Sequence, residues 1–325
     1  MQTRRQFLTS AAIVAAVGTG VSTSAYSQAW PQRPVKVIVA FAPGGNSDSI
    51  ARIVCQRLSE IFGQSFVIEN RGGSGGSIGA EAAARAAPDG YTLFMGVSSP
   101  MAVTPAMQKV RYDPIKDFVA ISNVGTNPLV LSVNAKSPIK NIAEFVAYAR
   151  SRPGKITFGS GGVGTINHLS MTLFAKRASL QVVHVPYKGG GPAMIDLIGG
   201  QIDAMFANLS DAIGQPDDKL RMLAVSSVKR VSQVPNIPSV SESGYSGFKT
   251  ETWNGLVAPA GTPQEIVDKL AAAVARASKE PEYIQRLSRI GVTAVGDTPQ
   301  EFAATIKEDV AQWAEAVKIA GLHKQ

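Results

Sequence analysis

Apolar runs that suit buried strands alternate with amphipathic helices along this chain, and this alternation constrains the fold more than any other feature. Residues 35–41 (VKVIVAF) form a continuous apolar run, as in a strand that is buried on both faces. A glycine-containing break at 42–45 follows, and then Ile50, Val54 and Leu58 recur at helical spacing. The order strand, helix, strand, helix, strand predicts a mostly parallel sheet with helices on its faces.

The alternation starts again after a break around Gly125–Pro128, with a new strand predicted at 129–133. Strands, glycine loops and helices then follow one another up to residue 225. The stretch 232–250 is rich in Ser, Pro and Gly and is expected to be a loop. A strand at 253–258 and two long C-terminal helices close the chain.

The length of 325 residues is typical of two domains, because one small core cannot bury that much chain. We expect an α/β protein with two doubly wound domains and an interdomain cleft, joined by two crossing segments. The C-terminal helices would pack back on the first lobe. The predicted limits are residues 30–127 with 252–325 for domain 1, and residues 128–251 for domain 2.

Residues 1–29 have the pattern of an export signal peptide. Arg4 and Arg5 supply a positive start, residues 11–21 are apolar and uncharged, and small residues at 27–29 offer a cleavage site. The apolar run is too short for a comfortable membrane-spanning helix. Because the start also resembles a twin-arginine signal, both the general and the twin-arginine routes of export stay open. We therefore expect a periplasmic protein.

Composition narrows the classes of function. Cys55 is the single cysteine, so the chain can form neither an intrachain disulfide nor a cysteine-based metal site. The formal net charge is +8, but no run of five basic residues occurs, which argues against a nucleic-acid partner. A mildly basic surface suits an anionic ligand or simply keeps the protein soluble. No cofactor and no metal are expected.

Three loops share one design, in which a strand ends in a glycine-rich turn that leads into a helix. They span residues 41–48 (FAPGGNSD), 159–168 (GSGGVGTINH) and 185–193 (VPYKGGGPA). Glycine lets the backbone approach a ligand closely, and the helix start directs N–H groups and the positive end of its dipole toward the turn. Since ligands of open α/β sheets lie outside the carboxyl ends of the strands, a carboxylate in the cleft could be held from both lobes.

Side chains in and near these loops could add specific contacts. Neutral hydrogen bonds are expected from Ser47, Ser98, Ser160, Thr165 and Asn167, and a hydroxyl and a charge from Tyr187 and Lys188. Asp48 either reaches an amino group of a ligand or caps its own helix.

Two short motifs suggest an enzyme instead. The segment Gly72–Gly76 fits the G-x-S-x-G pattern of a nucleophile, so an exported serine hydrolase that uses Ser74, Asp89 and His184 is the alternative function. The segment Gly159–Gly164 fits the dinucleotide pattern G-x-G-x-x-G, but no Asp or Glu follows at the distance that a ribose requires.

From Trp30 onward the chain resembles the substrate-binding proteins of tripartite tricarboxylate transporters, the Bug or TctC-like family. The matching segments are WPQRPVKVIVAFAPGG (30–45), VIENRGGSGGSIGAE (67–81), PDGYTLFMG (88–96), HVPYKGGGPAMIDLIGGQIDAMF (184–206), LRMLAVSS (220–227) and GLVAPAGTPQEIVDKL (255–270). The resemblance implies a two-lobe type II periplasmic-binding-protein fold that closes on its ligand. It also implies a monomeric, non-enzymatic receptor for a small carboxylate: a di- or tricarboxylate, an amino acid or an aromatic acid. The implied partner is a TctA/TctB-like membrane permease or a sensor.

The resemblance also implies which residues contact the ligand. In the first lobe these are Phe41, Ala42, Pro43, Gly44, Gly45, Ser47 and Asp48, and in the second lobe Ser160, Gly164, Thr165, His168, Tyr187 and Lys188. The chain departs from the family pattern after the third strand, at residues 97–105 (VSSPMAVTP). The far end of the ligand would therefore meet Ser98, Ser99 and Met101.

Overall fold

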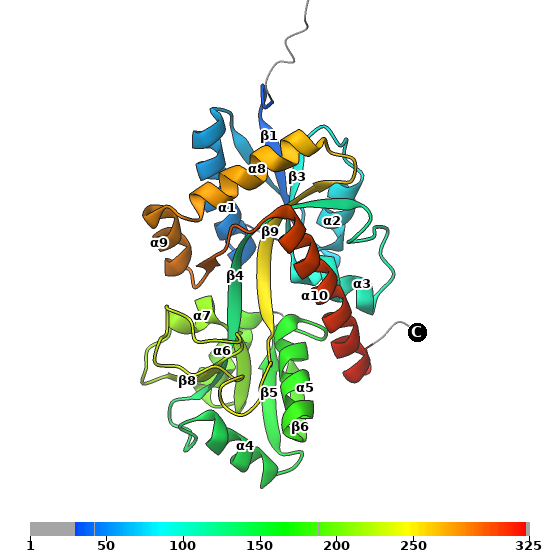
Figure 1. Ribbon diagram of the computed structural model, residues 1–325. Coiled ribbons are helices and arrows are strands. Elements are labelled where there is room, and N and C mark those ends of the chain that lie inside the picture. Colours follow the sequence, from blue (N-terminus) through cyan, green and yellow to red (C-terminus); the bar gives the residue numbers. More distant parts are fainter. Residues whose placement is uncertain (1–29, 42, 188, 323–325) are drawn as a thin grey trace, which may run out of the picture.

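Two long antiparallel strands, β4 (Phe118–Asn134) and β9 (Glu251–Pro259), run between the two lobes of the molecule (Figure 1). The computed structural model describes residues 30–41, 43–187 and 189–322. β4 pairs with β9 as far as Pro128, and from Leu129 onward it pairs with strands of the second lobe. The sheet of each lobe is therefore continuous with the strands that connect them.

The first lobe has the strand order β2-β1-β3-β9-β4. Its strands β1 (Val35–Val39), β2 (Phe66–Asn70) and β3 (Thr92–Val97) are parallel, and β9 runs antiparallel to β3. The short strand β10 (Thr293–Ala294) pairs with β4. The helices are α1 (Asn46–Phe62), α2 (Ser77–Ala84), α8 (Gln264–Ala277) and α9 (Pro281–Arg289), with a 3-10 turn, η1 (Ser74–Gly76), before α2.

The second lobe continues the order as β4-β7-β5-β6, with β8 also paired to β4. Its strands are β5 (Ile156–Ser160), β6 (Val182–Pro186), β7 (Ala204–Asn208) and β8 (Leu220–Val225). Parallel pairing joins β5 to both β6 and β7. The helices are α4 (Ile142–Arg150), α5 (Ile166–Ala178), α6 (Gly190–Gly199) and α7 (Leu209–Ile213). Each lobe thus has the predicted α/β architecture.

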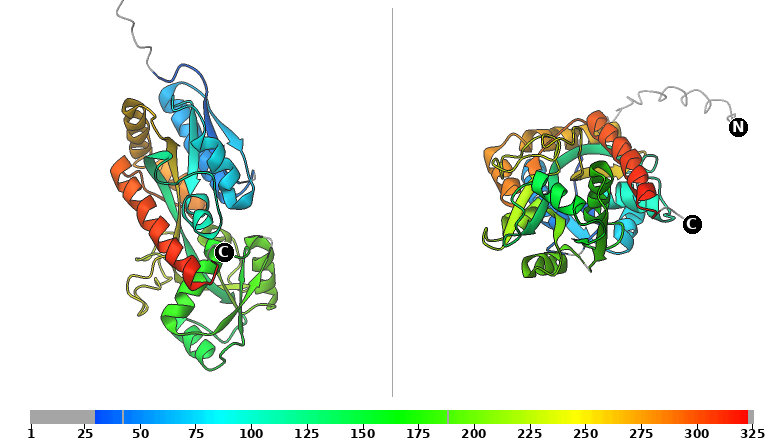
Figure 2. Two further views of the ribbon diagram at one scale, coloured as in Figure 1. Left: turned by 90° about the vertical axis from the view of Figure 1, so that its right-hand side faces the viewer. Right: turned by 90° about the horizontal axis from the view of Figure 1, so that it is seen from below.

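The last helix, α10 (Pro299–Ile319), spans both lobes (Figure 1, Figure 2). Its start is fixed by a capping box between Thr298 and Glu301. Phe302 packs into a buried first-lobe cluster, whereas Trp313 and Val317 pack into the buried cluster of the second lobe. The expectation that the C-terminal helices return to the first lobe is therefore correct for α8 and α9 but only for the first half of α10. Three helices close the chain where two were expected, because the stretch splits at Pro281 and Pro299.

The predicted break at Gly125–Pro128 is wrong, because β4 runs through it without interruption. Shifts of register against β9 absorb the irregular sequence between Ala120 and Gly125. Pro128 stands where β4 exchanges β9 for β7 and β8, so its missing N–H costs little there. The residues that suggested a break are therefore those at which β4 passes from the sheet of the first lobe to the sheet of the second.

The connection from β3 to β4 contains a π-helical turn, η2 (Ser99–Val103), and the short helix α3 (Thr104–Met107). In the described part of the chain, no helix is both long and apolar enough to cross a membrane. The predicted signal peptide lies outside the described residues, and the predicted domain limits stay a prediction.

Candidate ligand-binding cleft

A cavity of about 470 Å³ opens between the two lobes. Residues from both lobes and from the connecting strand β9 line it. They are Phe41, Gly45, Asn46, Ser47, Val97, Ser98 and Ser99 of the first lobe, Gly161, Thr165, Ile166, Asn167, Gly189, Gly190 and Asn208 of the second lobe, and Thr252 and Asn254 of β9. The cavity therefore lies at the carboxyl ends of β1 and β3 on one side and of β5, β6 and β7 on the other, as ligand sites of α/β sheets do.

Three helices begin at this cavity. Gly45, Thr165 and Gly189 are the N-cap residues of α1, α5 and α6, and all three line it. Neither α1 nor α6 has a side-chain cap, so backbone N–H groups of their first turns remain available to a ligand. Each helix start also carries partial positive charge from the helix dipole. An anion in the cavity would be attracted from both lobes at once.

The polar lining is neutral. Among the described residues that line the cavity, none has an ionisable side chain; the polar ones are Asn, Ser and Thr, and the apolar ones include Phe41, Val97 and Ile166. Amide and hydroxyl groups can donate hydrogen bonds without the desolvation cost of a buried charge. The site is thus suited to a small anion with an apolar body.

Asp48 supports the first-lobe loop from behind. Its carboxylate accepts hydrogen bonds from the Gly44 backbone N–H (3.0 Å), from Arg52 (2.8 and 3.2 Å) and from Asn70 Nδ2 (3.0 Å). Asn70 Nδ2 also donates to the Phe41 carbonyl oxygen at 2.9 Å. Burial opposes ionisation of Asp48, but these hydrogen bonds keep the pKa of its carboxyl below the ordinary value. The carboxylate is therefore engaged in holding the turn in shape.

The second-lobe loop rests on two stacked histidines. The His184 and His168 rings lie 3.8 Å apart, and Phe158 stacks on His184 at 4.8 Å. His184 Nε2 lies 2.7 Å from Ser160 Oγ, and His168 Nδ1 accepts a hydrogen bond from the Gly164 backbone N–H at 3.1 Å. Burial, together with the charge that His184 would carry, lowers the pKa of His168 to about 4. Burial also lowers the pKa of His184.

The structure separates the predicted site residues into two groups. Those that line the cavity are Phe41, Gly45, Ser47, Ser98, Ser99, Thr165 and Asn167. Those that lie beside or behind the lining are Pro43, Gly44, Asp48, Ser160, Gly164, His168 and Tyr187. Ala42 and Lys188 lie outside the described residues. Contact of any of these residues with a ligand stays a prediction.

Two of the remaining side chains have other partners. The Tyr187 hydroxyl donates to Asp196 Oδ2 at 2.7 Å, and burial with the Asp196 charge raises the pKa of Tyr187 to about 12. Met101 is fully buried in the hydrophobic cluster around Phe94 and Trp253. Met101 therefore packs in the core of the first lobe and is absent from the lining of the cavity.

Three lining residues were missed by the sequence analysis. Asn208 is the N-cap of α7, and a helix-start signal after an apolar strand could have identified it. Thr252 and Asn254 lie on β9, opposite Asn127 and Gly125 of β4. No local pattern marks them, because their place in the cavity depends on strand pairing across more than a hundred residues.

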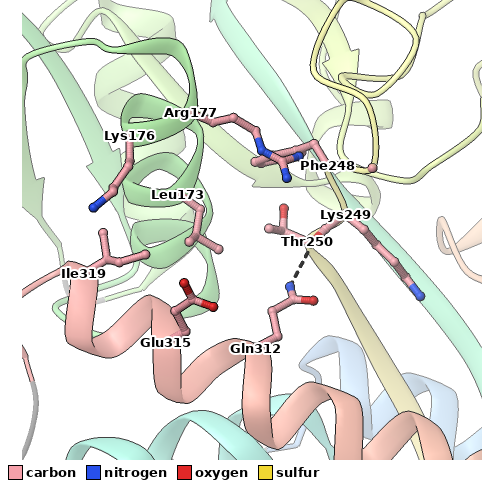
Figure 3. Close-up of a pocket in the computed structure, with 10 residues that line it drawn as sticks. Leu173, Lys176, Arg177, Phe248, Lys249, Thr250, Gln312, Glu315 and Ile319 are labelled. Carbon is pink, nitrogen blue, oxygen red and sulfur yellow. Dashed lines mark hydrogen bonds between the residues drawn. The ribbon is translucent and has the colours of Figure 1, made fainter.

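A second cavity, of about 330 Å³, lies between α5, the segment 247–250 and α10 (Figure 3). Gln312 Nε2 donates across it to the Lys249 carbonyl oxygen at 2.9 Å. Its lining carries the charged side chains of Lys176, Arg177, Lys249 and Glu315, and no helix of the described part of the chain begins there. The interlobe cavity differs from it in collecting three helix starts.

Neither a metal site nor a reactive thiol is found among the described residues. No three His, Cys, Asp or Glu side chains there lie close enough to hold a metal ion. Cys55 is buried in the first-lobe core, and burial raises the pKa of its thiol to about 12. It is thus a packing residue on α1.

The hydrolase alternative is wrong. Two of its three residues have other partners: His184 contacts Ser160, and Asp89 pairs with Arg33 at 3.2 Å. Ser74 lies in η1 of the first lobe, whereas His184 lies on β6 of the second. The comparisons below also give it no support.

Comparison with known proteins identifies the family of this chain. The profile described as "Tripartite tricarboxylate transporter family receptor" (TctC) matches residues 50–322. Protein BugT of Bordetella pertussis is 34% identical over 93% of this chain and 94% of its own length.

Two solved structures from Rhodopseudomonas palustris show the same fold. One, determined with adipate, is 35% identical with a TM-score of 0.79 and covers 90% of this chain and 99% of its own. The other, MatC with bound malate, is 32% identical with a TM-score of 0.75 and covers 89% of this chain and 100% of its own. The predicted two-lobe periplasmic-binding-protein fold is thereby confirmed. This chain belongs to the TctC family of tripartite tricarboxylate transporter receptors, which are non-enzymatic periplasmic solute-binding proteins.

Proposed function

We propose that the interlobe cavity captures a small organic acid by its carboxylate. The observation that carries this proposal is the convergence of the α1, α5 and α6 helix starts on one cavity whose described lining has no ionisable side chain. A fixed set of backbone N–H groups attracts an anion and needs little reorganisation when it binds. The relatives solved with adipate and with malate bind molecules of this class.

Capture follows from the distribution of the helix starts. Because α1 belongs to one lobe and α5 and α6 to the other, an anion between them gains its full set of contacts only when the lobes approach each other. The ligand then stabilises the closed form by the difference in contact energy between the two forms. No chemical step is required.

The test is a binding panel with neutral analogues. Adipate, malate, an aromatic acid and an amino acid are each compared with the corresponding amide by calorimetry and by thermal shift. At least one acid raises the melting temperature and binds at least about tenfold more tightly than its amide, because the helix starts favour negative charge. If no acid binds at millimolar concentration, or if amides bind equally well, the proposal is wrong.

We further propose that residues 1–29 are removed on export and that the mature chain, as a monomer, passes its ligand to a TctA/TctB-like permease. The family description supports work with a transporter. N-terminal sequencing of protein from the periplasmic fraction tests the cleavage, and crosslinking to the permease in the presence and absence of ligand tests the partner. Specific crosslinks to a sensor kinase in place of the permease would contradict the partner proposed here.

A further inference from the structure

Two histidines that do not line the cavity hold the second-lobe loop that does. His168 lies on the first turn of α5 and His184 on β6, and the parallel pairing of β5 with β6 brings their rings together. Phe158 lies opposite His184 in the β5–β6 register, with its ring centroid 4.8 Å from that of His184 and 5.9 Å from that of His168, so the three rings form one cluster. The cluster lies beside the glycine loop 160–165, which connects β5 to α5.

Each imidazole makes a hydrogen bond to a different end of this loop. His168 Nδ1 accepts from the Gly164 backbone N–H at 3.1 Å. His184 Nε2 lies 2.7 Å from Ser160 Oγ, and the same Oγ donates to the Gly162 carbonyl oxygen at 2.9 Å and accepts from the Gly162 N–H at 3.1 Å. The loop is therefore tied at its start through Ser160 and at its end through Gly164.

The loop needs such ties because its own backbone is permissive. Gly162 and Gly164 have positive φ values of 131° and 76°, which glycine adopts at little cost and also leaves easily. Gly161 and Thr165, at either end of this turn, line the cavity. A small movement of the loop would carry the α5 helix start out of line with those of α1 and α6.

We propose that His168 and His184 are positioning residues, whose stacked neutral imidazoles hold the glycine loop 160–165 in the shape that receives the ligand. This inference rests on the proposed function of the cavity. The chemistry requires the uncharged form of His168, since a protonated Nδ1 would direct an N–H toward the Gly164 N–H. Burial and the neighbouring His184 lower the pKa of His168 to about 4, which keeps this form at neutral pH.

The decisive comparison is between His168→Asn and His168→Leu. Both changes remove the aromatic ring, but the asparagine side chain places an oxygen near the position of Nδ1, where it can still accept from Gly164. Hydrogen exchange of the amides at 161–165 is measured in the ligand-free protein, and the Kd for adipate and for malate is measured by calorimetry. The expected result is loop exchange about tenfold faster and binding five- to tenfold weaker in the leucine variant, with most of both effects restored by asparagine.

A second matched pair guards against misfolding. His184 is half-buried, so His184→Gln and His184→Leu are expected to fold. Glutamine keeps a hydrogen-bonding group for Ser160, and leucine does not. Loop exchange and ligand affinity are expected to stay closer to the wild-type values in His184→Gln than in His184→Leu. The melting temperatures of these two variants should fall by similar amounts, because both lose the imidazole that stacks on His168.

Equal loop exchange in the asparagine and leucine variants would overturn the proposal, and so would faster exchange without weaker binding. Either result would mean that the histidines only fill space. If the wild-type protein binds neither adipate nor malate, the proposed function of the cavity as a site for these acids is wrong. The exchange comparison still decides whether the imidazoles hold the loop.

Discussion

Asp309 on α10 accepts a hydrogen bond of 2.6 Å from Trp253 Nε1 on β9. Trp253 is buried and packs edge-on against Phe302 of the same helix, with ring centroids 5.1 Å apart. Burial raises the pKa of the Asp309 carboxyl, and the hydrogen bonds that it accepts counteract this effect. The helix that spans both lobes is therefore fixed to the strand that connects them, close to the cavity residues Thr252 and Asn254.

Trp253→Phe should destabilise the protein by about 1–3 kcal/mol, because it leaves the half-buried Asp309 without its short hydrogen bond. Urea denaturation measures this loss. In the double variant Trp253→Phe with Asp309→Asn the loss should be smaller than the sum of the two single losses, since no unpaired charge remains. Strictly additive losses would show that the two side chains are not coupled.

Ser47→Asp should weaken carboxylate binding at least about tenfold without lowering the melting temperature. Ser47 lines the cavity in the first turn of α1, where an added acid repels an anionic ligand but interacts favourably with the helix dipole. Calorimetry with adipate and malate checks the affinity. The matched control is Ser49→Asp, which places the same charge on the same helix outside the cavity lining; equal weakening by both variants would contradict the assignment of the cavity.

Gly164→Ala should destabilise the second-lobe loop by about 2 kcal/mol or more. The φ of Gly164 is 76°, which costs an alanine about 1–2 kcal/mol, and the added Cβ would meet Met107 Sδ and Cε. Gly154→Ala isolates the backbone cost, since its φ is 71° and no atom lies within 4 Å of the added Cβ. Thermal unfolding of both variants should show the larger loss at Gly164, and adding Met107→Ala should recover the excess. Equal losses at the two glycines would mean that the Met107 contact is unimportant.

Stability should fall as the pH decreases from about 6.5 to 4, in part because of His168. Its pKa is about 4 in the folded protein and about 6.5 in the unfolded chain, so the unfolded chain binds more protons in this interval. The stabilisation is fully present above pH 6.5 and is lost toward pH 4; after allowance for solvent screening it is on the order of 2 kcal/mol.

Urea denaturation at a series of pH values measures this dependence. His168→Leu isolates the contribution, because the variant lacks the titrating group and should lose less stability on acidification than the wild type. Parallel curves for the two proteins would refute the assignment.

Much of this fold was predictable from local patterns. The apolar run at 35–41 becomes β1 over 35–39, and the glycine turn at 159–168 leads into a helix, α5 over 166–178, as predicted. The spacing of apolar residues and the positions of glycine are properties of a few neighbouring residues, so they identify strands, helices and helix starts without knowledge of the fold. The three glycine loops were located in the same way, and residues from all three line the cavity.

The sequence by itself therefore determined the strands, the helices and the anion-attracting turns, because these depend on neighbours along the chain. The tertiary structure alone decided that β4 serves both sheets, that Asn254 faces the cavity, and that His168 and His184 stack. Each of these depends on pairing between segments far apart in sequence, as when β5 places Phe158 opposite His184. Such register is set by the packing of whole lobes, which no local pattern encodes.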